Sequence, residues 1–88
     1  MRKTWTDQGW EDYLCWQTQD RKTLRRINDL VKDIERNGLG AGIGKPEPLR
    51  GDLQGFWSRR IDEKNRIVYG QVERDALCIL ACRGHYGD

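Results

Sequence analysis

The sequence predicts an α+β fold in which two N-terminal helices pack on one face of a mainly antiparallel sheet. Two observations predict it. Apolar side chains recur at spacings of three and four in the first half of the chain, which is typical of helices, whereas the second half consists of short apolar runs separated by turn residues. With 88 residues the chain is expected to form a single domain, residues 1–88, with a modest core.

The first half predicts a short strand and two helices. Lys3–Trp5 is a weak strand signal. Thr6 or Asp7 is a suitable N-cap for a helix that runs to about Thr18, and Asp20 is a suitable N-cap for a second helix. The second helix is expected to stop at Asn37-Gly38. The expected inward stripes are Trp10, Tyr13, Leu14 and Trp16 on the first helix, and Leu24, Ile27, Leu30, Val31 and Ile34 on the second.

The second half predicts three strands, at residues 55–61, 66–72 and 76–83. The turns between them are short, at residues 62–65 and 73–75, which favours an antiparallel meander. The third strand is the most apolar, so it is expected to lie centrally in the sheet. If both helices cover one face, the other face is left for a partner or a substrate.

Composition and charge narrow the classes of function. The chain has a net charge of +2, but residues 21–36 carry +3 and residues 37–72 carry +2, so an anionic partner is expected to bind the middle of the chain. Three cysteines, an odd number, argue against a disulfide framework and indicate the cytoplasm. The sequence contains no zinc-site spacing, no apolar run of membrane-spanning length and no signal peptide, so neither a metal nor a membrane is expected.

Gly44–Leu49 places one carboxylate, Glu47, between two prolines. Each proline restricts its own backbone and that of the residue before it, so Glu47 is expected to be held extended on a stiff loop. Considered alone, this element is also consistent with a rigid connector between helix and sheet. Lys45 and Arg50 flank it and add positive charge.

Arginines gather on the first predicted hairpin. Arg60 and Arg66 flank its four-residue turn almost symmetrically, so their side chains are expected to share a face of the sheet, while Arg59 points to the other face. Two adjacent guanidinium groups repel each other unless an anion lies between them, and arginine binds phosphate through paired hydrogen bonds. The alternative is a solvated strand face, or ion pairs with Asp62 and Glu63.

A carboxylate, paired arginines and a histidine match the needs of RNA cleavage by an adjacent 2′-hydroxyl. A base takes the proton of that hydroxyl, an acid protonates the departing 5′-oxygen, and cations stabilise the charge of the transition state, so no metal is required. His85 is the only histidine, and Tyr86 follows it. Each also has a simpler interpretation: His85 could be a surface residue, and Tyr86 could be a packing residue at the sheet edge.

The order and the residue identities of these motifs resemble those of the YoeB/Txe family of toxins across essentially the whole chain. The first helix contributes Trp10–Leu14 and Trp16-Gln17, and the second contributes Ile27-Asn28. The segments that carry the rest of the resemblance are Lys45–Leu49, Gly55–Ile61, Asn65–Tyr69, Ala81–Arg83 and His85-Tyr86. Two features depart from the family pattern: Gly84 replaces a bulky aromatic residue, and Gly87-Asp88 extend the chain past Tyr86.

The resemblance implies a RelE-like fold and an mRNA endoribonuclease that acts in the A site of the 70S ribosome without a cofactor. It also implies a homodimer, and inhibition by a YefM-like antitoxin through which the toxin would meet DNA only indirectly. Glu47 matches the general base of the family and His85 its general acid. Arg60 and Arg66 match the arginines that stabilise the scissile phosphate. The expected RNA-positioning residues are Lys45, Arg50, Arg59 and Tyr86.

Two other functions remain open from the sequence. The chain could be a binding module that blocks the ribosomal A site, or acts with its antitoxin as a repressor, without cutting RNA. It could also be a metal-free ribonuclease that acts on naked RNA.

Overall fold

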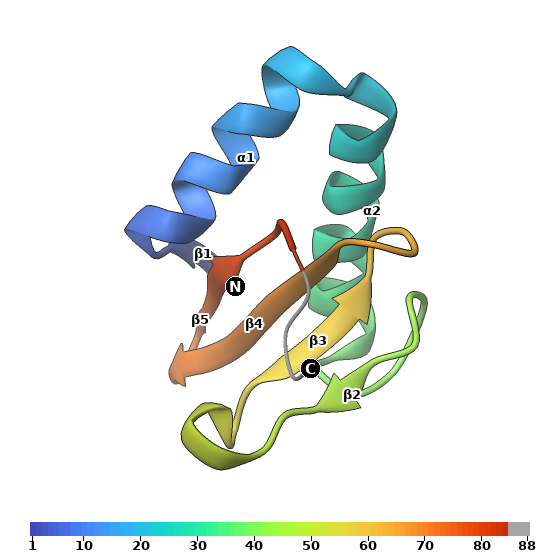
Figure 1. Ribbon diagram of the computed structural model, residues 1–88. Helices are drawn as coiled ribbons and strands as arrows, with labels where there is room; N and C mark the ends of the chain where they lie inside the picture. Colours follow the sequence, from blue (N-terminus) through green and yellow to red (C-terminus); the bar gives the residue numbers. More distant parts are fainter. Residues whose placement is uncertain (85–88) are drawn as a thin grey trace.

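A computed structural model describes residues 1–84 and has the predicted α+β architecture (Figure 1). Along the chain the elements are β1 (Arg2–Trp5), α1 (Asp7–Gln19), α2 (Arg21–Asn37), β2 (Glu47–Pro48), the 3₁₀ turn η1 (Gly51–Leu53), β3 (Trp57–Arg60), β4 (Arg66–Glu73) and β5 (Ala76–Ala81). The five strands form one sheet in the order β1-β5-β4-β3-β2. The predicted three-strand antiparallel meander is β3, β4 and β5; β2 adds to β3 in an antiparallel direction, and β1 adds to β5 in parallel.

The helix boundaries follow the capping residues that the sequence predicts. The hydroxyl of Thr6 accepts a hydrogen bond from the Gly9 amide at 3.0 Å and starts α1. Asp20 ends α1, and its carboxylate accepts from the amides of Lys22 and Thr23 at the start of α2. Gly38, with φ of 93°, ends α2. Within residues 1–84, neither helix combines the length and the apolar character needed to cross a membrane.

The core lies between the helices and one face of the sheet. From α2 it takes four of the five predicted residues, and Leu24 is half-buried. The sheet contributes Ile67, Tyr69, Leu77 and Ile79. The prediction for α1 is partly wrong. Trp16 is buried, but Trp10 is 47% exposed and Leu14 is 38% exposed. Trp10 packs outside the core, against Trp5 on the edge strand β1 and against Tyr13 of its own helix.

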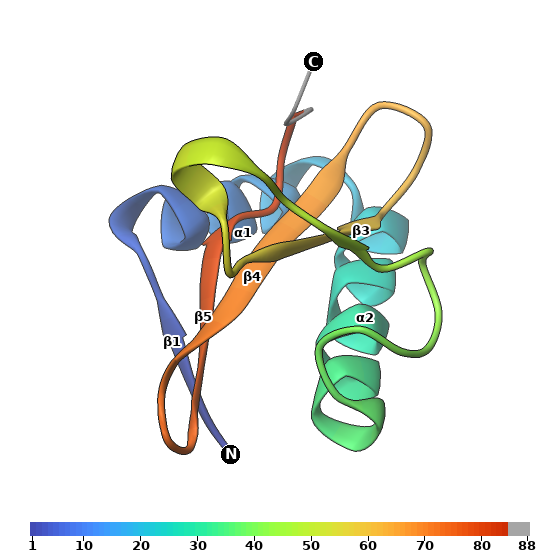
Figure 2. The same ribbon diagram turned by 90° about the horizontal axis from the view of Figure 1, so that it is seen from below.

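The opposite face of the sheet is less open than the sequence predicts. Figure 2 shows α2 on one side of the sheet and the segment that contains η1 on the other. The Phe56 ring packs so closely over Gly70 that a β-carbon there would overlap the ring. Ser58 and Val68 are buried on this face, whereas Arg60 is exposed. The open part of the face is therefore its arginine-bearing end.

Two strand assignments need correction. Glu47-Pro48 is not a loop but a two-residue edge strand, because Glu47 pairs with Ser58 and Pro48 with Trp57 of β3. The β5 strand is interior, with β1 and β4 on its two sides, but β4 is the middle strand because β3 and β2 both add beyond it.

We expect Gly9→Ala to destabilise the protein by about 1–3 kcal/mol. Alanine favours an exposed helix by up to about 1 kcal/mol over glycine. At this position, however, a β-carbon would fall on the carbonyl oxygen of Ile79, so α1 would have to move away from β5. Urea denaturation measures the change. The exposed Gln17→Ala in the same helix serves as the control, and equal stability of the two variants would contradict the prediction.

Candidate active site

The register of three strands places Glu47, Arg60 and Arg66 on one face of the sheet. Glu47 of β2 pairs with Ser58 of β3, and Arg60 of β3 pairs with Arg66 of β4. Side chains of paired residues share a face, as do residues two apart on one strand. The strand register therefore puts these three residues on the face opposite the helices, and the predicted shared face of Arg60 and Arg66 is observed.

Arg60 lies between the other two members of this group. The β-carbons of directly paired residues are about 5 Å apart and those of diagonal neighbours about 7 Å apart, so Arg60 is next to Arg66 and diagonal to Glu47. Among residues 1–84, neither arginine lies within 4 Å of a carboxylate, so the predicted alternative of pairing with Asp62 and Glu63 does not occur. In the same part of the chain, the buried Nη1 of Arg66 has no hydrogen-bond partner. Two like charges held side by side favour an anion between them.

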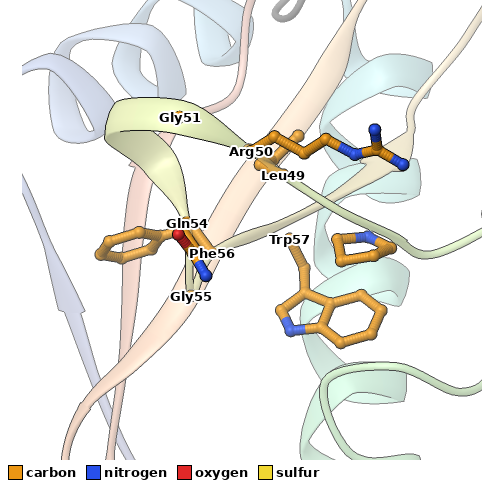
Figure 3. A pocket seen from close by; sticks show the side chains of 8 residues that line it. Leu49, Arg50, Gly51, Gln54, Gly55, Phe56 and Trp57 are labelled. Atoms are coloured by element: carbon orange, nitrogen blue, oxygen red, sulfur yellow. The ribbon is translucent and has the colours of Figure 1, made fainter.

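Lys45 and Arg50 extend the positive charge along the strand that holds Glu47. Both are exposed, and Lys45 has a φ of 54°, a conformation that is uncommon outside glycine. Arg50 lines an open pocket of about 530 Å³ with Gln54, Phe56 and Trp57 (Figure 3). The rings of Phe56 and Trp57 point to opposite sides of the strand: Phe56 packs over Gly70, and the Trp57 indole lies against Gly40. The Arg50 guanidinium is the charged group that this pocket offers to an anion.

The chain is tied down just before His85. Asp12 accepts a hydrogen bond from the Cys82 amide at 3.0 Å, and the indole of Trp16 donates to the Cys82 carbonyl at 2.8 Å. Two residues later, the Gly84 amide donates to Asn65 and the Gly84 carbonyl accepts from the Arg66 amide. His85 and Tyr86 themselves lie outside the described residues. The backbone that leads to them is bonded directly beside Arg66.

Gly84 has a φ of 89°, which favours glycine, and a β-carbon there would meet nothing within 4 Å. The glycine therefore fits a specific backbone conformation in which its amide and carbonyl are both bonded. Asn65 is held in turn by the Asp62 carboxylate at the hairpin turn. Desolvation alone would raise the pKa of Asp62, but hydrogen bonds from Asn65 and Lys64 outweigh it and lower that pKa. The sequence indicated this turn but not that it would anchor the C-terminal segment.

Arg59 is not available to RNA, so its prediction as an RNA-positioning residue is wrong. It is fully buried, and its guanidinium makes five hydrogen bonds. It donates to the carboxylate of Asp33 on α2 and to the hydroxyl of Tyr69 on β4. The other three acceptors are backbone carbonyls, those of Gly38, Ala41 and Ile43. A cation can be buried in this way because every donor is satisfied.

We expect Asp33 to make stability depend on acid pH. The hydrogen bond from Arg59, followed by that from the Ile43 amide, lowers the pKa of Asp33 below its ordinary value of 3.8. A carboxylate whose pKa is lower in the folded state stabilises the fold above its unfolded pKa, and that contribution is lost as the pH falls through the folded value. Asp33→Asn should therefore lower the melting temperature at pH 7, with a smaller difference from wild type at pH 3. An equal difference at both values would contradict this.

No group of three or more His, Cys, Asp or Glu side chains within residues 1–84 is arranged to hold a metal ion. Burial raises the pKa of the Cys82 thiol to about 12, so this cysteine is a protonated core residue and not a nucleophile.

Comparison with known proteins identifies close relatives over the full length of the chain. The sequence profile of the "YoeB-like toxin of bacterial type II toxin-antitoxin system" matches residues 5–86. The chain is 54% identical to toxin YoeB of Streptomyces coelicolor, over 98% of this chain and 100% of that protein. It is similar to the solved structure of a YoeB/ParE toxin from Agrobacterium tumefaciens, with a TM-score of 0.92, 44% identity and coverage of 98% and 100% of the two chains.

A Staphylococcus aureus relative has been solved both as a YoeB dimer and as a YoeB-YefM complex. The two structures match with TM-scores of 0.90 and 0.89 and identities of 43% and 42%, over 98% of each chain.

Proposed function

Since the chain belongs to the YoeB-like toxins of bacterial type II toxin–antitoxin systems, we propose that it is a metal-independent endoribonuclease that cuts mRNA in the A site of the translating 70S ribosome. The observation that supports this best is the shared face of Glu47, Arg60 and Arg66. That face combines a proton acceptor with two cations that have no carboxylate partner within residues 1–84.

In the proposed reaction, Glu47 takes the proton of a ribose 2′-hydroxyl while the oxygen of that hydroxyl attacks the adjacent phosphorus. Arg60 and Arg66 stabilise the additional negative charge on the phosphate oxygens. His85 gives a proton to the departing 5′-oxygen, which leaves a cyclic phosphate on one fragment and a 5′-hydroxyl on the other. The tethering of Gly84 beside Arg66 supports a position for His85 near the phosphate.

The remaining exposed groups would hold the RNA. Lys45 and Arg50 continue the positive charge beyond Glu47, and they would contact phosphates of the RNA on either side of the scissile bond. Tyr86 would add a further contact. On the ribosome, positioned rRNA and mRNA phosphates would supply the long-range attraction to the basic part of the chain.

The proposed partners follow the relatives from S. aureus, which form a YoeB dimer and a YoeB-YefM complex. We propose that this chain forms a homodimer in the cytoplasm and is inhibited by a YefM-like antitoxin that covers the arginine-bearing face. Contact with DNA would occur only through the antitoxin.

A translation extract with a defined mRNA tests the proposed function. We expect cleavage within the codon in the A site, mapped by primer extension, and little or no cleavage of the same mRNA without ribosomes. Translation that stops while the mRNA stays intact would support a non-cleaving A-site blocker instead. Comparable cutting with and without ribosomes would support a general ribonuclease.

A further inference from the structure

The loop that leads to Glu47 is hydrogen-bonded to an ion pair that consists of the buried Arg59 and the partly exposed Asp33. Arg59 donates to the backbone carbonyls of Gly38, Ala41 and Ile43 at 2.7–3.0 Å. Asp33 accepts from the Ile43 amide at 2.9 Å, so the Ile43 peptide is held at both its amide and its carbonyl. Asp33 receives Arg59 Nη1 at 2.6 Å, which joins the two halves of this clamp.

Residues 38–44 also pack so closely against Arg59 and Asp33 that no space remains for additional atoms. A β-carbon on Gly42 would fall on the Asp33 carboxylate, and one on Gly44 would come within 3.1 Å of the β-carbon of Arg59. These two glycines have φ values of 116° and 82°, so the backbone there is restricted to glycine-like conformations as well. The position of residues 38–44 therefore depends on this pair.

Only three residues separate the clamped Ile43 peptide from Glu47. The first, Gly44, accepts a hydrogen bond at its carbonyl from the Arg60 amide at 2.7 Å. Lys45 then turns with a φ of 54°, and Pro46 restricts the backbone before Glu47 enters β2. Little slack remains, so a displacement at Ile43 reaches Glu47.

We propose that Arg59 and Asp33 are positioning residues that set the location of Glu47 relative to Arg60 and Arg66. Arg59 and Arg60 are neighbours on β3, so their side chains point to opposite faces of the sheet. Arg59 binds the loop before Glu47 on the helix side, and Arg60 faces the proposed phosphate site. One strand thereby determines the distance between the base and the cations. This inference rests on the proposed role of Glu47 as the base.

The substitution that tests it is Asp33→Asn, which keeps the shape of the side chain but removes its charge and one acceptor. A displacement of about 1 Å at a reacting group can cost about a hundredfold in rate. We expect a tenfold or greater fall in the cleavage rate at saturating ribosome concentration, with the half-saturating concentration nearly unchanged. The matched control is Glu73→Gln, which removes a carboxylate from an exposed pair with Arg2 and should cleave at the wild-type rate. All variants are compared at a temperature at which each is fully folded.

A double-mutant cycle separates positioning from general loss of stability. If Asp33 acts through Glu47, then Asp33→Asn should cause no further loss in a Glu47→Gln background. An equal loss in both backgrounds, or wild-type cleavage by Asp33→Asn, would overturn the proposal.

Hydrogen exchange gives a second test that does not depend on activity. We expect Asp33→Asn to speed exchange in peptides that cover residues 43–49 while β4 and β5 stay protected. Unchanged exchange in residues 43–49 would overturn the proposal even if the cycle cannot be measured. If the wild-type protein does not cut mRNA but this exchange pattern is found, the proposed function fails while the structural clamp on β2 is supported.

Discussion

Glu47→Gln should lower the rate of A-site cleavage by about 10²–10⁴-fold, the usual range for loss of a general base. Glutamine keeps the size and shape of the side chain, so the pairing of β2 with β3 and the neighbouring arginines should be preserved. It cannot accept the proton of the 2′-hydroxyl. Because Glu47 is exposed, we expect the melting temperature of the Glu47→Gln variant to stay close to that of wild type.

The measurement is single-turnover cleavage in the translation extract, with the toxin in excess over the ribosome–mRNA complexes. Glu63→Gln is the matched control, because Glu63 is an exposed glutamate in the hairpin turn and the same atoms are exchanged. His85→Ala should also lose cleavage, because the departing 5′-oxygen would no longer receive a proton from the histidine. If Glu47→Gln and His85→Ala both cut at the wild-type rate, the assignment of base and acid is wrong.

Arg59→Ala should destabilise the fold by about 2–4 kcal/mol, because it removes a buried guanidinium that satisfies five acceptors, although the Asp33 carboxylate left behind is partly exposed. The substitution leaves the Asp33 carboxylate, the Tyr69 hydroxyl and three backbone carbonyls without their donor. Small domains have only about 5–15 kcal/mol of stability in total, so the substitution should remove a large part of it and lower the urea midpoint clearly.

Urea denaturation compares the free energies of unfolding of Arg59→Ala and Arg60→Ala, which change two adjacent arginines of the same strand. Arg60 is the adjacent residue, is exposed, and has no ion pair within residues 1–84, so its substitution should change stability by less than about 0.5 kcal/mol. Similar costs for the two variants would contradict the view that Arg59 is structural. Arg60→Ala should instead lose cleavage in a folded protein.

Much of the fold was predictable because its signals are local. Thr6 and Asp20 cap the helices through hydrogen bonds to residues two or three positions away. The grouping of Arg60 with Arg66 was also predictable, since a short turn and a side-chain period of two determine which residues of a hairpin face each other.

The exposure of Trp10 was not predictable from the helical period. That period placed Trp10 on the inward stripe of α1, but its exposed position depends on where Trp5 and Tyr13 lie after β1 joins β5 in parallel. The same holds for the covered part of the sheet. Nothing local to Phe56 indicates that its ring packs on Gly70, which comes from the next strand.

By itself, the sequence determined the order of the helices and of every strand except β2, the restricted backbone around Glu47, and the resemblance to a toxin family. The tertiary structure alone decided that Arg59 is fully buried and cannot contact RNA. Arg59 and Arg60 are chemically identical, and the burial of Arg59 depends on acceptors that lie 10–26 residues away in the chain. A buried guanidinium is stable only when the folded chain brings all of those acceptors together, and no short segment of sequence contains that information.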